Sequence, residues 1–215
     1  MSTDRHLQEA VLAEFLWEPS ITAAHIGVTA DAGVVTLTGH VQTYAEKHAA
    51  QEAASRVKGV KAVAQELEVH IPGTRKRGDE EIAKAAIDRL AWEVIVPHDA
   101  IKVAVDKGWV TLSGEVGWQF QKEGAERAVR GLMGVVGISN HTTLKTRVNT
   151  TNISDDINDA LGRSWFDDDK IKVTAVGGKV KLTGSVDSLS ERWAAGTTAW
   201  ASPGATDVEN DLVVA

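Results

Sequence analysis

One nine-residue pattern occurs three times along the 215-residue chain, and it limits the possible folds more than any other feature. The pattern is Gly-x-Val-x-Leu-[Ser/Thr]-Gly-x-Val, over residues 33–41, 108–116 and 178–186. A further glycine and then an amide side chain follow each copy at fixed spacing. Self-similarity of this kind indicates a chain built from copies of one unit. We therefore predict three units, and their boundaries are 1–72, 79–147 and 150–215.

Each unit shows the same order of local signals. Apolar residues recur four apart at Leu7, Val11 and Phe15, which predicts one buried stripe on an opening helix. The segment 101–105 alternates apolar and polar residues, as a half-buried strand does, and a turn sequence at 106–108 joins it to the repeated pattern. A second helix and a last strand follow. The predicted class is α+β, with three tandem α-β-β-α-β units. Each unit is expected to have a three-stranded mixed sheet and two helices on one face.

The repeated glycines and amides are predicted to be structural. The glycines shape turns, and the amides alternate with core positions of the last strand, where a buried amide needs hydrogen-bond partners. We expect each amide to tie down a turn or a helix end; the alternative is a carbonyl ligand for potassium. The positions are Gly33, Gly39, Gly59, Gly108, Gly114, Gly134, Gly178, Gly184 and Gly204, with the amides Gln65, Asn140 and Asn210.

The hairpin pattern, the later glycine and the terminal V-x-[N/Q]-x-L strand together resemble the BON domain family (bacterial OsmY and nodulation). Three copies of the unit that carries these features cover the whole chain. The resemblance implies small, non-enzymatic bacterial modules that are associated with osmotic and envelope stress and with transport. It also implies a proposed phospholipid-binding role or, in a cytoplasmic relative, potassium binding. The family has no agreed catalytic residues, so none are carried over.

Composition excludes several kinds of site. The chain has no cysteine, which excludes disulfides, thiolate metal sites and cysteine nucleophiles. A net charge of −7 disfavours nucleic-acid binding. The first residues lack a secretory signal, and no segment is apolar enough to span a membrane. We therefore expect a cytoplasmic protein without a transmembrane segment, a cofactor or a resident metal.

Asp167, Asp168 and Asp169 form a run of three adjacent carboxylates before a predicted strand of the third unit. Three adjacent carboxylates could hold a cation. The alternative is a solvated turn, whose charge is partly neutralised by nearby lysines. Both interpretations stay open at this stage.

Tryptophan is unusually frequent, with seven residues against three Phe and one Tyr. Trp17, Trp92 and Trp165 recur near the end of each opening helix, and we predict core or hinge packing for them. The unrepeated Trp109, Trp193 and Trp200 fall on outward faces of a strand and a helix. We predict that this second group forms a contact surface, either for a neighbouring unit of the chain or for an external partner.

The sequence thus predicts a non-catalytic binding protein linked to stress. It would act through surface contacts with a phospholipid surface or a protein partner, and self-association is open. The alternative is a cytoplasmic sensor of potassium or another cation. An enzyme is disfavoured because no catalytic motif is present.

Overall fold

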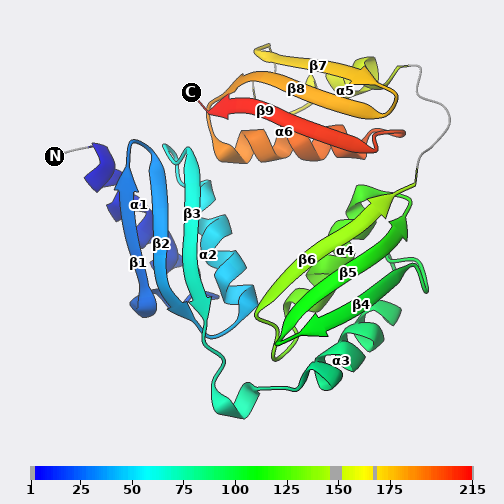
Figure 1. Ribbon diagram of the computed structural model, residues 1–215. Coiled ribbons are helices and arrows are strands. Elements are labelled where there is room, and N and C mark those ends of the chain that lie inside the picture. The colour runs from blue at the N-terminus through cyan, green and yellow to red at the C-terminus, as the bar shows by residue number, and fades with distance from the viewer. Residues whose placement is uncertain (1–2, 146–151, 167–168, 215) are drawn as a thin grey trace. The chain divides into compact units, whose positions relative to one another are not determined.

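The computed structural model describes residues 3–145, 152–166 and 169–214 (Figure 1). The chain divides into two compact units, residues 1–143 and 144–215. The first unit holds two copies of one fold, which we call repeats 1 and 2, and the second unit holds repeat 3. Each repeat has a helix, a strand hairpin, a second helix and a third strand.

The helices and strands have the following bounds. Repeat 1 contains α1 (Thr3–Trp17), β1 (Ile26–Asp31), β2 (Val34–Val41), α2 (Tyr44–Arg56) and β3 (Ala62–Val69). Repeat 2 contains α3 (Asp79–Ala91), β4 (Ile101–Asp106), β5 (Trp109–Val116), α4 (Gln119–Arg130) and β6 (Gly137–Leu144). Repeat 3 contains α5 (Ile153–Leu161), β7 (Ile171–Val176), β8 (Lys179–Val186), α6 (Leu189–Ala201) and β9 (Asp207–Val214). Two short 3₁₀ turns lie at Ala23–His25 and Gly73–Arg75.

Each sheet has three strands in sequence order, and the predicted α+β class is confirmed. The first two strands of a repeat are antiparallel, as in β1–β2, β4–β5 and β7–β8. The third strand runs parallel to the second in β2–β3 and β8–β9. The parallel pair requires a crossover, and the second helix supplies it. Figure 1 shows both helices of a repeat on one face of its sheet.

The core of each repeat lies between its helices and its sheet. In repeat 3, Ile157 of α5, Leu182 of β8 and Ala195 of α6 belong to one buried cluster. Small side chains on the second helix let it approach the sheet closely. The equivalent cluster of repeat 2 contains Ile82 of α3 and Leu112 of β5. The predicted apolar stripes therefore face the core.

The second glycine of the repeated pattern is required by a close backbone approach. Gly39, Gly114 and Gly184 have φ of 109°, 140° and 125°, which L side chains rarely adopt. A Cβ atom at each would collide with the backbone carbonyl oxygen of the residue before the first strand. The repeated glycine therefore lies where the backbone of the second strand meets the residue just before the first strand.

None of the helices in the described part of the chain is both long enough and apolar enough to cross a membrane.

Candidate functional site: the tryptophan loops

The repeated amides connect the third strand to the second helix of each repeat. Each side-chain NH₂ donates a hydrogen bond to a backbone carbonyl of that helix. We call this contact the amide lock. Its three bonds run from Gln65 Nε2 to Lys47 O (2.8 Å), from Asn140 Nδ2 to Lys122 O (2.9 Å) and from Asn210 Nδ2 to Arg192 O (2.8 Å).

The amide oxygens also have backbone partners in repeats 2 and 3. Asn140 Oδ1 accepts from the N–H of Thr142 at 3.2 Å, and Asn210 Oδ1 accepts from the N–H of Leu212 at 3.3 Å. In repeat 3 the guanidinium of Arg192 donates to the backbone oxygen of Asn210 at 2.7 Å. The amide oxygens of Asn140 and Asn210 therefore already accept hydrogen bonds, and the backbone oxygen of Asn210 already has a guanidinium partner.

Each repeat also has a connection from its first helix to its first strand. We call these connections the tryptophan loops, and their described residues are 16–25, 91–100, 162–166 and 169–170. Their tryptophans are highly exposed: Trp17 by 87%, Trp92 by 83% and Trp165 by 73%. Each repeat thus presents an indole to solvent from the same connection of the fold.

This exposure corrects the prediction that these three tryptophans pack in a core or hinge. Trp17 lies two residues after Phe15, the last buried residue of the α1 stripe. Trp92 lies two residues after Leu90, the last buried residue of α3. Two steps of about 100° turn a side chain to the far side of a helix. Trp165 comes after α5 has ended and is exposed as well.

Each tryptophan loop is held to its repeat by one buried apolar side chain. Ile21, Val96 and Phe166 occupy equivalent positions in the three repeats, and all three are buried. In repeat 2, Ile95 also lies against Gly124 of α4, where a side chain would collide with it. The loops are therefore packed onto the fold while their indoles remain in solvent.

Hydrogen bonds from the start of the second helix add to this anchoring. In repeat 1 the buried carboxylate of Glu46 accepts from the backbone N–H of Thr22, in the tryptophan loop, at 2.7 Å. The same carboxylate accepts from the N–H of Gln42 at 2.9 Å. Glu46 thus joins the loop, the end of β2 and α2. At the equivalent positions, Gln121 and Glu191 accept from the backbone just before α4 and α6.

The charges beside Trp17 are paired. Ser20 Oγ donates to Glu18 Oε1 at 2.8 Å, and this hydrogen bond is the largest cause of the lowered pKa of Glu18. Arg56 of α2 lies 3.2 Å from the other oxygen of Glu18 and 3.0 Å from Glu14. Ionised carboxylates at this loop are therefore partly compensated by one guanidinium.

Apolar exposure extends beyond the tryptophan itself in the first two loops. Leu16 is exposed next to Trp17, and Val94 is exposed two residues after Trp92. In repeat 2 the start of α4 adds an exposed Phe120, whose ring lies 6.3 Å from that of Trp118. Exposed apolar side chains that gather at one end of a fold indicate a contact surface.

The tryptophans predicted from sequence as the contact surface have three different settings. Trp109 is 48% exposed; its ring covers Gly137, and its Nε1 donates to Ser139 Oγ at 2.9 Å. Trp193 of α6 is 72% exposed, whereas Trp200 is partly buried. Trp109 belongs to the first compact unit and the other two to the second.

The predicted acidic cation site falls mostly outside the described residues. Asp167 and Asp168 are not among them, and Asp169 is exposed. Within the residues that are described, no three histidine or acidic side chains are arranged to hold a metal ion.

Comparison with known proteins identifies the repeated fold. The model of the BON domain matches residues 3–70, 78–146 and 149–215. Osmotically-inducible protein Y of Escherichia coli (strain K12) is 32% identical over 148 residues. That match covers 67% of this chain and 73% of the relative.

Two similar solved structures come from CdsD, a structural protein of the type III secretion system of Chlamydia trachomatis. One is 16% identical and covers 98% of this chain and 92% of that one, with a TM-score of 0.27. The other, a C-terminal domain, is 15% identical and covers 97% of both chains, also with a TM-score of 0.27. A TM-score this low supports no conclusion about this chain.

Proposed function

The chain belongs to the BON domain family, and on that premise we propose that it is a non-catalytic stress-response protein that attaches to phospholipid surfaces. Its three tryptophan loops make the attachment. The observation that carries this proposal is the solvent exposure of Trp17, Trp92 and Trp165. The link to stress is supported by the osmotically inducible relative.

An exposed indole suits the boundary between lipid and water. Its ring is largely apolar and its N–H is polar, so it gains by entering the headgroup region, where tryptophan is enriched in membrane proteins. Burying one large apolar side chain contributes roughly 1.5–3 kcal/mol. One loop would thus bind weakly, and three loops on one chain would bind more tightly through avidity.

The anchoring of the loops supports this role. The buried side chains of Ile21, Val96 and Phe166 hold the loops in place before any surface is met. A preformed loop loses little conformational entropy on binding. The indoles can therefore enter a lipid surface without rearrangement of the core.

The overall charge decides which term drives attachment. A net charge of −7 opposes anionic lipids over the molecule as a whole. Apolar insertion must then dominate, and neutral phosphatidylcholine should already support binding. The basic residues Arg75, Lys76 and Arg77, in the linker after β3, would add a local attraction to anionic lipid.

Other functions have less support. In repeats 2 and 3 the amide oxygens considered as potassium ligands accept backbone hydrogen bonds instead. We propose no catalytic activity, because the chain carries no motif of a known catalytic mechanism. The cytoplasmic location expected from the sequence stays a prediction.

Vesicle co-sedimentation tests the proposal. The variant W17A/W92A/W165A removes the loop tryptophans, and W109A/W193A/W200A removes the same number from other faces as a matched control. We expect the loop variant to bind phosphatidylcholine vesicles at least about tenfold more weakly, since each indole contributes more than 1.4 kcal/mol. The control should bind close to the native level, and thermal melts establish that both variants fold.

Two results would overturn the proposal. If the loop variant binds like the native chain, the loops are not the attachment site. If the native chain binds neither neutral nor anionic vesicles, the surface is not lipid, and a protein partner becomes the better explanation.

A further inference from the structure

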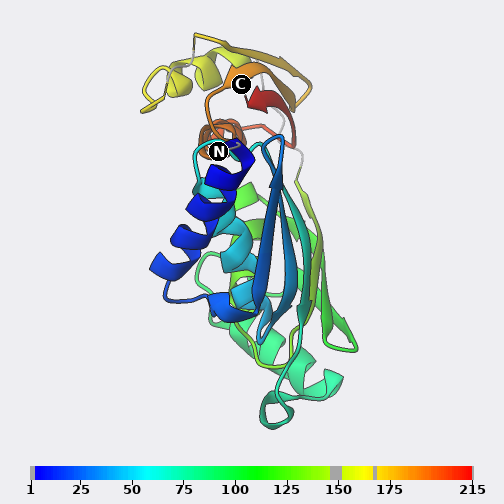
Figure 2. The same cartoon turned by 90° about the vertical axis from the view of Figure 1, so that its left-hand side faces the viewer.

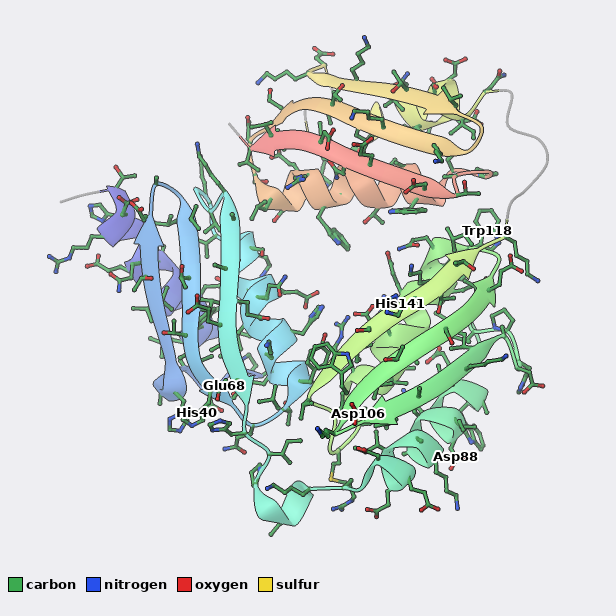
Figure 3. All side chains as sticks on the ribbon, in the orientation of Figure 1. His40, Glu68, Asp88, Asp106, Trp118 and His141 are labelled. Atoms are coloured by element: carbon green, nitrogen blue, oxygen red, sulfur yellow. The ribbon has the colours of Figure 1, made fainter. Side chains whose placement is uncertain are left out.

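Three histidines of repeat 1 form a continuous row across its sheet. His25 comes directly before β1, His40 lies in β2, and His70 comes directly after β3. The ring centroids of His25 and His40 are 4.7 Å apart, and those of His40 and His70 are 5.1 Å apart. Both pairs are stacked with an interplanar angle of 23°. We call this arrangement the histidine row; Figure 3 labels its central member, His40.

The row lies on the outer face of the sheet, away from the helices. Leu37 and Val41 of β2 point into the core, so His40 between them in the alternation points outward. His25 and His70 are both exposed. The two outer imidazoles are therefore open to solvent and to any surface that meets this face, and His40 between them is partly buried.

The row is at the same end of repeat 1 as its tryptophan loop. Trp17 lies near the start of the loop and His25 ends it, so both belong to one short connection. Figure 2 shows α1 descending to the end of the sheet where β1 begins. His70 is followed five residues later by the basic run that starts at Arg75. Aromatic, imidazole and basic groups thus occur on neighbouring segments of this end of the repeat.

The row is unique to repeat 1. The β1–β2 pairing places Ile26 opposite Gly39, and the same pairing recurs in the other two repeats, which fixes the equivalent positions. None of those positions carries a histidine. They are Ala100, Glu115 and Lys145 in repeat 2, and Lys170, Ser185 and Ala215 in repeat 3.

We propose that the histidine row makes attachment of the chain to anionic phospholipid dependent on acid. The inference rests on the proposed function, because it concerns the same loop and the same kind of surface. Imidazole is the side chain whose charge changes between about pH 5 and 8. On acidification the row would become a strip of positive charge beside the exposed Trp17.

Stacking couples this charge to binding. Two charged rings only 4.7 or 5.1 Å apart repel each other. Lipid phosphates against the row would relieve that repulsion. Proton uptake and attachment to an anionic surface therefore favour each other.

The acidic groups around the row do not compensate the positive charge of all three imidazoliums. Glu68 of β3 contacts the row, with its Oε2 3.0 Å from His70 Nε2, and Glu66 lies two residues earlier on the same outer side. Glu18 is bound to Ser20 and Arg56, and Glu46 is buried with backbone partners. Glu68 can thus compensate one imidazolium of the three.

A metal site is the other role that three neighbouring histidines suggest, and the geometry does not favour it. The rings lie face to face in a row, whereas a metal ion needs nitrogens that converge on one point about 2 Å away. No such convergence is found among the described histidine and acidic side chains.

The test compares two histidine variants of the full chain. H25Q/H40Q/H70Q removes the row, and H6Q/H141Q removes two exposed histidines that lie outside both the row and the tryptophan loops. Binding to vesicles of phosphatidylcholine with phosphatidylglycerol is measured at about pH 8 and about pH 5, with thermal melts to establish folding. Pure phosphatidylcholine vesicles serve as the uncharged surface.

We expect the native chain and the control variant to bind the anionic vesicles more tightly at the lower pH. In the row variant the gain should be smaller by roughly 30-fold or more, since at least two charges of about 1 kcal/mol each near an anionic surface are removed. If the row variant keeps the whole gain, or if the gain is equal on pure phosphatidylcholine, the inference is wrong while the proposed function stands. If the native chain binds no vesicle at either pH, the proposed function fails with it.

Discussion

The amide locks and the tryptophan loops differ in how strictly the three repeats agree. The locks place an amide at the same register in every repeat, with donor–acceptor distances of 2.8–2.9 Å. The loops present an exposed indole in every repeat, yet Trp165 does not occupy the position of Trp17 and Trp92. A hydrogen bond inside a fold needs one atom at one place. A lipid surface needs only an indole within reach, so its position can vary.

The largest predicted effect tests a position that, like the amide lock, is the same in all three repeats. Gly114→Ala would force a Cβ against the backbone oxygen of Ala100 at a φ of 140°. We expect a loss of stability of about 3 kcal/mol or more, measured by denaturant unfolding. Gly131→Ala is the matched control, because a Cβ there meets nothing within 4 Å. Equal stabilities of the two variants would contradict this account of the repeated glycine.

The amide lock should give the next largest effect. Asn140→Ala leaves the carbonyl of Lys122 and the N–H of Thr142 without their amide partner. The expected cost is about 1–3 kcal/mol in the free energy of unfolding. Asn158→Ala, at an exposed helix position, is the control and should change stability little. A neutral Asn140→Ala would show that the repeated amide is not needed for the fold.

A contact between α2 and α4 predicts a smaller, pH-dependent effect. His48 Nδ1 lies 3.0 Å from Arg130 Nη1, and burial, followed by the Arg130 charge, lowers the pKa of His48. The unfolded chain then binds the proton more readily than the folded chain. The resulting stability is present above about pH 6.5 and is lost as the pH falls below it.

The variant His48→Gln checks this effect by thermal melts across that pH range. It should lose less stability on acidification than the native chain, and His6→Gln, at an exposed site, should follow the native chain. The reverse order would show that His48 is not held neutral by the fold.

The smallest predicted effect belongs to the tryptophan loops. Trp17→Ala should change the free energy of unfolding by less than about 0.5 kcal/mol, because the side chain is 87% exposed. Ile21→Ala in the same loop removes a buried side chain and should cost more than about 2 kcal/mol. If Trp17→Ala costs more stability than Ile21→Ala, Trp17 is a structural residue, and the loop tryptophans do not differ from the amide locks in their role.

The sequence predicted the fold well because the fold depends on local patterns. Alternation in residues 101–105 and the glycine turn at 106–108 are enough to identify β4, β5 and their hairpin. The four-residue spacing of Leu7, Val11 and Phe15 likewise identifies the buried face of α1. These signals require no knowledge of distant contacts.

The candidate site was predicted less well, for two physical reasons. Recurrence of Trp17 and Trp92 suggested packing, although their spacing from Phe15 and Leu90 already places them on the far side of each helix. The histidine row depends on strand pairing, which brings residues 25, 40 and 70 together across the sheet. Only a residue-by-residue register of all three strands could have revealed it from sequence.

The most direct test of the central claim is fluorescence quenching by vesicles of brominated phosphatidylcholine. Two complementary variants each retain three tryptophans. W109F/W118F/W193F/W200F keeps those of the loops, and W17F/W92F/W118F/W165F keeps those of the other faces. We expect strong quenching in the first variant and little in the second. Equal quenching, or stronger quenching in the second, would contradict attachment through the tryptophan loops.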